Sequence, residues 1–269
     1  MRTRIVLGRE PVVREVRAAA PLMAALAAPV TARAPWLTAV LNAGPAGPFG
    51  PRPAAVVVET DPQSPPVAAA FLSLRRRGLY TAVTVLGAGT PPVPGGRSPA
   101  RLPARDATAA AELAAGIGEL VDSLRGPRTL RLTGLPQGDP TVRALSARLR
   151  DGVVGNSRST GLVDGLDQLA GVTRSRDPAA LERWLPQLLA REPDPRARAF
   201  LRSAARLHAA IGQVELAVLA EDGELRAGLL TLVDGADRWP WWGSSDVGGL
   251  SAGRGAPLVS LTAPARRWP

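Results

Sequence analysis

The clearest pattern of hydrophobic and polar positions lies in residues 194–212. Asp194 and Pro195 are typical of a helix start, because an Asp side chain can accept a backbone hydrogen bond there and proline lacks only an N–H that the helix does not use. Gly212 is typical of a helix end. Between them, apolar residues recur at the spacing of one helix face: Phe200, Ala204, Leu207 and Ile211. This spacing predicts an amphipathic helix with that face buried.

After this helix the pattern becomes that of strands. Residues 214–219 predict one strand, the acidic turn 221–224 follows, and the long apolar run 225–233 predicts its hairpin partner. Residues 238–242 predict a third strand. Because Pro240 cannot donate a hydrogen bond to a ladder, that strand must lie at a sheet edge or carry a bulge.

The first half of the chain repeats this order of elements. Three strands joined by turns and followed by a Gly-rich loop are predicted at residues 54–59, 67–74 and 80–86. The order repeats although the identity between the halves is low, which indicates a duplicated lobe. We expect domains at residues 1–160 and 161–269, with the polar stretch 155–161 as the link between them.

Further helices are predicted where an aspartate precedes a helical stripe of apolar residues: Asp106, Asp139 and Asp177. Gly116 and Gly118 would each weaken the first of these helices by about 1 kcal/mol unless another part of the chain packs closely against them. Residues 128–133 alternate and predict a strand. Helices mixed with strands in this way predict an α/β or α+β chain.

The amino-acid sequence of one segment resembles that of a known superfamily. Residues 198–235 read RAFLRSAARLHAAIGQVELAVLAEDGELRAGLLTLVDG. This stretch is similar to the C-terminal lobe of the cellulose-biosynthesis-type branch of the GNAT acyltransferases, which is related to the two-lobed Fem-type aminoacyl transferases. The resemblance implies two GNAT-like lobes, each a mixed, mainly antiparallel sheet flanked by helices.

In that superfamily, backbone N–H groups at the start of a helix after the meander hold the cofactor's pyrophosphate, favoured by the helix dipole. The resemblance therefore implies that Gly253, Arg254 and Gly255 bind acetyl-CoA or another acyl-CoA, which is a substrate here. A helix of about two turns is expected after them. Leu250 and Pro257 depart from the superfamily's pattern, and a flexible C-terminal tail is the alternative interpretation.

Acyl transfer to an amine acceptor needs a base and groups that stabilise charge. Glu215 lies where such families place a base, and Asp246 follows the tryptophan cluster. Either carboxylate could instead be an ordinary surface group of a strand or turn. Four aromatic residues are candidates for an acceptor pocket: Trp239, Trp241, Trp242 and Tyr80. The tryptophans could also merely cover a sheet edge, and the tyrosine could be half-buried in its own sheet.

Other catalytic classes find little support in the composition. The chain has no cysteine, and His208 is its only histidine. Packing is therefore the default role for His208, and no metal site is expected. There is no Gly-x-Ser-x-Gly motif to suggest a serine nucleophile.

The formal net charge of +10 would suggest nucleic acid as a partner. However, all 33 basic residues are arginine, most are dispersed, and only 4% of residues are aromatic, which leaves few stacking platforms for bases. Residues 75–77 hold three consecutive arginines, a run that is usually a solvated turn. No apolar run reaches the ~20 residues of a membrane span, and we expect a cytoplasmic protein.

The sequence thus predicts an acyl-CoA-dependent N-acyltransferase acting on an amine acceptor. The alternative is a catalytically inactive GNAT-fold binding or interaction module, and a more distant one is an arginine-rich nucleic-acid binder.

Overall fold

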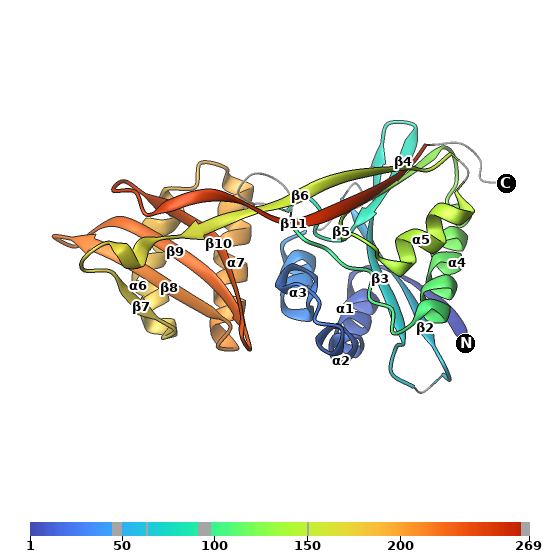
Figure 1. The fold of residues 1–269 in the computed structure, drawn as a ribbon, viewed down its shortest axis with the longest axis horizontal. Helices are drawn as coiled ribbons and strands as arrows, with labels where there is room; N and C mark the ends of the chain where they lie inside the picture. The colour runs from blue at the N-terminus through green and yellow to red at the C-terminus, as the bar shows by residue number, and fades with distance from the viewer. Residues whose placement is uncertain (45–49, 63, 91–97, 150, 265–269) are drawn as a thin grey trace. The chain divides into compact units, whose positions relative to one another are not determined.

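A computed structural model describes residues 1–264 except 45–49, 63, 91–97 and 150. The chain divides into two compact units (Figure 1). The first comprises Met1–Ala88, Pro99–Arg158 and the chain from Ala256 onward, and the second is built on residues 159–255. The segment after Ala256, which the sequence analysis assigned to the second domain, is thus part of the first unit.

The first unit is built around a seven-stranded sheet with the order β1-β2-β3-β4-β5-β11-β6. β4 and β5 pair in parallel, whereas the pairs β1–β2, β2–β3, β3–β4 and β5–β11 are antiparallel. Its strands are β1 (Arg2–Leu7), β2 (Arg52–Glu59), β3 (Ala68–Arg77), β4 (Tyr80–Val85), β5 (Arg128–Pro136), β6 (Val153–Asp164) and β11 (Leu250–Ala263). Its helices are α1 (Arg9–Ala18), α2 (Ala20–Ala25), η1 (Val30–Ala32), α3 (Ala34–Ala43), α4 (Ala107–Ser123) and α5 (Pro140–Arg148).

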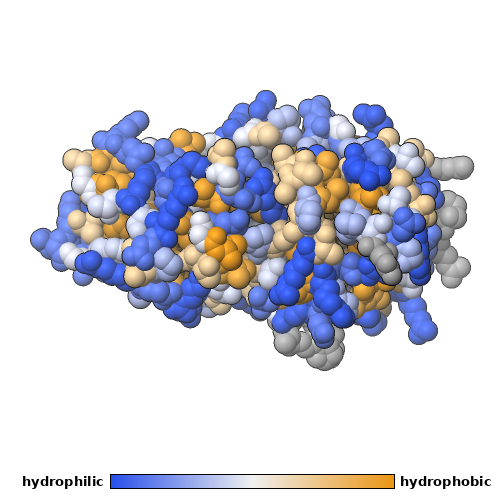
Figure 2. Space-filling model, turned by 90° about the horizontal axis from the view of Figure 1, so that it is seen from below, coloured by the Kyte–Doolittle hydropathy of each residue, from blue (hydrophilic) through white to orange (hydrophobic). Residues whose placement is uncertain are grey.

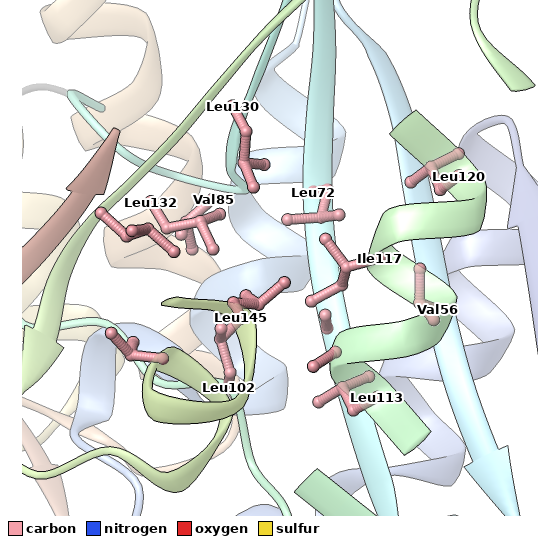
Figure 3. Packing of buried hydrophobic residues seen from close by; sticks show 14 of the residues in the cluster. Val56, Leu72, Val85, Leu102, Leu113, Ile117, Leu120, Leu130, Leu132 and Leu145 are labelled. Carbon is pink, nitrogen blue, oxygen red and sulfur yellow. The ribbon is translucent and has the colours of Figure 1, made fainter. Parts of the chain in front are cut away.

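Helices cover both faces of this sheet, with α4 and α5 on one side and α1 to α3 on the other (Figure 1). Figure 3 shows Leu113, Ile117 and Leu120 of α4 packed beside Val56 of β2 and Leu72 of β3, all of them fully buried. This apolar contact supplies most of the driving force for docking α4 on the sheet.

Gly116 explains how α4 comes so close to the sheet. A Cβ atom at this position would lie 2.7 Å from Cγ1 of Val56 and would overlap Cγ2 of Thr3. The low helix propensity of glycine is therefore offset by close packing, as the sequence analysis required for this position.

The second unit contains a four-stranded antiparallel sheet with the order β10-β9-β8-β7. Its elements are η3 (Leu166–Gln168), β7 (Thr173–Ser175), α6 (Pro178–Ala190), α7 (Pro195–Ala210), β8 (Val214–Glu221), β9 (Glu224–Asp234) and β10 (Asp237–Ser245). Helices α6 and α7 pack on one face. On the other face a smaller core of Leu166, Ala217, Leu219, Ala227 and Leu229 is packed against Leu162, Leu169, Val172 and Leu250. The predicted α+β class with two sheet-bearing lobes is confirmed.

The helix starts predicted from aspartate are confirmed in atomic detail. The side chains of Asp106, Asp139, Asp177 and Asp194 each accept a hydrogen bond from a backbone N–H in the first turn of α4, α5, α6 and α7. Each bond satisfies a donor that the helix itself leaves unpaired.

The buried face of α7 differs from the predicted one. Ile211 is 49% exposed, and Leu207 is only partly buried, whereas His208 is 1% exposed. Leu201 and Ala205 are buried as well. The buried stripe is thus rotated around the helix axis, because the sheet contacts a face that includes the histidine. A hydrophobicity pattern alone scores a histidine as polar and misses this.

The expected link at residues 155–161 contains the boundary between the two units, at Arg158 and Ser159, and has the backbone of strand β6. The prediction of a helix after Ala256 is wrong, because these residues are part of strand β11. Contacts between the strands run in opposite order: Gly155 with Ser260, Ser159 with Gly255, Val163 with Gly253 and Gly165 with Gly249. Pairing between distant segments supplies the backbone hydrogen bonds that the local sequence does not predict.

No helix in the described part of the chain has the length and apolar character needed to cross a membrane. On the face drawn in Figure 2, hydrophobic residues form small patches separated by hydrophilic ones.

Candidate functional site

The candidate site lies at strand β10, the edge strand of the four-stranded sheet. Its register with β9 passes from Pro240, opposite Thr231, to Trp242, opposite Leu230, so Trp241 is an extra residue in a β-bulge. The prediction of an edge strand or a bulge from Pro240 is confirmed, because β10 is an edge strand and also carries a bulge. Bulges at sheet edges change the direction of backbone groups and are common next to active sites.

The bulge determines where the tryptophans point. Trp241 is fully buried and meets Phe200 of α7 edge to face, with 6.1 Å between ring centroids. Trp242 is also buried, and its Nε1 donates a hydrogen bond to Glu192, 3.1 Å away, in the α6–α7 connection. Consecutive residues of a regular strand would point to opposite faces, so the bulge allows both to contact the helical layer. Of the three tryptophans, Trp239 alone is partly exposed.

Glu215, the predicted base, is held by three arginines. It lies on β8 and is 8% exposed. Its carboxylate accepts hydrogen bonds from Arg238 and from Arg174, at 3.1 Å and 3.2 Å, and lies 3.7 Å from Arg176. Arg174 also pairs with two further carboxylates, Asp164 and Asp167, at 2.8 Å each. One network of ion pairs therefore joins five elements: the end of β6, η3, β7, β8 and β10.

This network controls the acid–base properties of Glu215. Hydrogen bonds from Arg238 and, to a smaller extent, Arg174 lower the pKa of the carboxyl below its usual value. A carboxylate with a lowered pKa is a weaker base, and its oxygens already accept several hydrogen bonds. The geometry favours a structural role, and the catalytic assignment of Glu215 stays a prediction.

We expect Glu215→Gln to lower the free energy of unfolding by about 1–2 kcal/mol at pH 7, because it removes a largely buried negative charge while three guanidinium groups remain beside it. The control is Glu221→Gln on the same strand, whose exposed ion pair with Arg226 is 3.3 Å long and contributes little. Urea unfolding measures both variants. Equal stabilities of the two variants would exclude a structural role for the network.

Asp246, the second predicted catalytic residue, follows β10. Arg191 holds its carboxylate in two hydrogen bonds of 2.8 Å and 2.6 Å. The same bonds lower the pKa of Asp246. Arg191 also donates to the carbonyl of Leu225, so it joins the end of α6 to β9 and to the end of β10. Asp246 is exposed, and its catalytic role is likewise still a prediction.

The predicted phosphate loop has an extended backbone. Gly253, Arg254 and Gly255 lie within β11, and no helix begins in residues 246–264. A Cβ atom on Gly253 would lie 2.5 Å from Cγ2 of Val163, and one on Gly255 would overlap Oγ of Ser159. These glycines allow side chains of β6 to lie across β11. The helix N-terminus on which the assignment depended is therefore missing from this position.

Tyr80 lies in the first unit at the start of β4, opposite Arg77 of β3, and is 37% exposed. The structure thus brings together Glu215 and the strand that carries Trp239, Trp241 and Trp242, whereas Tyr80 belongs to the first unit. The sequence does not predict the roles of Arg174, Arg191 and Arg238, because a dispersed arginine carries no signal of the carboxylate with which it pairs. No cluster of three or more potential metal ligands occurs in the described residues.

Comparisons with known proteins found one family model and several solved structures to which the chain is similar. Residues 163–256 match the family model for an Acetyltransferase (GNAT) domain. No curated protein matches the chain. Similar solved structures include a tandem GNAT protein from the clavulanic acid biosynthesis pathway, at 16% identity and a TM-score of 0.41, covering 98% of this chain and 99% of that one.

FemX is similar at 12% identity and a TM-score of 0.46, over 86% of this chain and 58% of the other. The C-terminal domain of a putative lysylphosphatidylglycerol synthetase from Agrobacterium fabrum is similar at 13% identity and a TM-score of 0.44, over 87% and 70% of the two chains. The segment that matches the GNAT acetyltransferase domain, residues 163–256, contains helices α6 and α7, the meander and the bulged edge strand.

Proposed function

We propose that the protein transfers an acyl group from acyl-CoA to an amine acceptor. The observation that carries this proposal is the bulged edge strand β10 inside the segment that matches a GNAT domain. The amine would attack the thioester carbonyl, so that a C–N bond forms and the C–S bond breaks. The amine loses a proton, and the coenzyme A thiolate gains one.

An edge strand suits this substrate for a chemical reason. The pantetheine arm of coenzyme A is an extended chain with two amide groups, and an extended chain with amides can add to a sheet edge through backbone hydrogen bonds. A bulge redirects backbone N–H groups, which are the donors that stabilise the oxygen of a tetrahedral intermediate. β10 would therefore position the thioester.

The two predicted catalytic carboxylates restrict the proton chemistry. Arginines lower the pKa of both Glu215 and Asp246, so neither takes up a proton readily at neutral pH. We infer that the acceptor amine reacts as the free base. The rate should then rise with pH until the amine's own pKa is reached.

A second candidate function is a GNAT-fold module that binds a ligand or partner without acyl transfer. One observation favours it: residues 246–264 form a turn and a strand, where the superfamily resemblance implied a helix for the pyrophosphate. Without that helix N-terminus, the diphosphate would lose backbone donors and a favourable dipole.

Release of free thiol from acetyl-CoA in the presence of a panel of amines tests the proposal. The wild-type chain should release thiol only when an amine is present, and Trp239→Ala should raise the KM for the amine while the chain stays folded. Trp184→Ala on α6 is the control, because that ring stacks with Arg183, 5.0 Å from its centroid, outside the candidate site. Absence of thiol release with every amine would favour the second candidate.

A further inference from the structure

The tip of the β3–β4 hairpin in the first unit carries an exposed leucine. Arg77 pairs with Tyr80, so Gly78 and Leu79 form a two-residue turn. Gly78 has a φ of 57°, which a glycine adopts without strain. Leu79 is 87% exposed, the highest value for a large hydrophobic side chain in the described part of the chain. The tight turn thus holds an apolar side chain in water.

Several arginines lie at the same end of the β3–β4 hairpin as this leucine. The end of β3 carries Arg75, Arg76 and Arg77, all exposed, and no carboxylate pairs with them among the described residues. Exposed Arg125 lies in a neighbouring loop, which is tied to the hairpin by a 2.9 Å hydrogen bond from the backbone N–H of Thr81 to the carbonyl of Pro127. In Figure 1 this tip lies at the top of the first unit, at the opposite end of the strands from the β2–β3 loop.

The net positive charge of the chain is concentrated in the first unit, which carries this hairpin. The first unit contains 21 arginines and 10 acidic residues, whereas the second contains 12 arginines and 13 acidic residues. The formal excess of positive charge therefore belongs to the first unit alone. An uneven distribution of this kind attracts an anionic surface and orients the protein on it.

We propose that the β3–β4 hairpin tip docks the protein on the surface of an anionic lipid bilayer. Leu79 enters the boundary between headgroups and acyl chains, Tyr80 lies at headgroup level, and the three arginines of β3 contact the phosphates. One apolar side chain binds a membrane only weakly, and a cluster of basic residues supplies the second signal that stable binding needs. This proposal is independent of the acyl-transfer activity.

The composition of the tip favours lipid over nucleic acid. An exposed leucine at the tip of a turn gains little from the phosphates or the base edges of a nucleic acid. In a lipid bilayer, burial in the acyl region removes its apolar surface from water. A binder of single strands would present several aromatic rings for stacking. Here Tyr80 is the sole aromatic residue of the hairpin tip.

Cosedimentation of the full chain with vesicles tests the proposal. Binding is expected to vesicles containing phosphatidylglycerol and not to phosphatidylcholine alone, and it should weaken as salt is raised. Leu79→Ser should weaken binding about tenfold or more. Replacing Arg75, Arg76 and Arg77 together by glutamine should weaken it about 100-fold, at about fivefold for each arginine.

A matched control removes the same charge elsewhere. Arg143, Arg196 and Arg202 are exposed arginines on α5 and α7, and their joint replacement by glutamine should weaken binding far less than the hairpin variant does. For a direct readout of insertion, Leu79→Trp should show a blue-shifted emission on anionic vesicles, and Val247→Trp, at an exposed position of the second unit, should not.

Three results would overturn the proposal. These are absence of binding to anionic vesicles, unchanged binding by Leu79→Ser, and equal effects of the two triple variants. Binding to an oligonucleotide that requires Arg75 to Arg77, without binding to vesicles, would assign the surface to nucleic acid instead.

Discussion

Acidification from pH 7.5 to pH 4 is expected to lower the free energy of unfolding of this protein by about 3 kcal/mol through His208 alone. The imidazole lies on α7 and is 1% exposed. Neither of its ring nitrogens has a hydrogen-bond partner among the described residues. Burial lowers the pKa of His208 to about 4, opposed only in part by the negative charge of Asp234.

The direction of the pH effect follows from proton uptake. In the unfolded chain His208 has an ordinary pKa near 6.5, so between pH 6.5 and pH 4 the unfolded state binds a proton that the folded state does not. Stability is therefore complete above pH 6.5 and falls as the pH drops toward 4.

His208→Leu isolates this contribution, because carboxylates elsewhere titrate equally in both proteins. Urea unfolding from pH 7.5 to pH 4 should show the stability of wild type falling by about 3 kcal/mol more than that of the variant. His208→Gln, which is polar and does not titrate, should behave like the leucine variant. Parallel pH profiles for wild type and both variants would show that the histidine is hydrated or paired in the folded state.

Arg4→Met is expected to lower the free energy of unfolding by about 2–3 kcal/mol at pH 7. Arg4 lies on β1 and pairs with Glu15 of α1 at 2.6 Å and with Glu59 of β2 at 2.7 Å. The side chains of the two glutamates are only 10% and 9% exposed. Removal of the arginine leaves two carboxylates with little water and no cation between them.

The magnitude is at the lower end of the range for buried pairs because Arg4 itself is 39% exposed and water screens part of the interaction. Chemical denaturation measures the loss. Arg4→Lys should recover part of the lost stability, since the positive charge remains but the bidentate hydrogen bonding of the guanidinium group does not. A loss below about 0.5 kcal/mol would mean that the pair behaves as a surface ion pair.

The features predicted correctly from the sequence are those that depend on neighbouring residues. An aspartate that precedes a helical stripe of apolar residues predicts the start of a helix, because its side chain bonds a backbone N–H within the next three residues. Asp106 and Asp194 are examples. Pro240 restricts its own strand to an edge or a bulge, because it lacks a donor wherever it lies. The acidic turn at 221–224 and the strands on both sides of it follow from local alternation in the same way.

The features predicted wrongly depend on distant residues. Strands β6 and β11 are rich in glycine and serine and have no marked alternation, and only their pairing across about 100 residues of sequence makes them strands. The ion pairs of Glu215 were not predictable for the same reason, because Arg174 and Arg238 reach it from separate strands. The buried face of α7 was predicted wrongly because the sheet packs against a face that includes His208, and no pattern within the helix shows where the sheet lies.

We propose that residues 163–256, which match a GNAT domain, bind acyl-CoA along β10. Thermal unfolding of the full chain with increasing acetyl-CoA tests it most directly. At a hundred times Kd the ligand should stabilise the folded state by about 2.7 kcal/mol, which raises Tm by about 5–10 °C for a chain of this size. No change in Tm with millimolar acetyl-CoA, or an equal change with an unrelated adenine nucleotide, would contradict the claim.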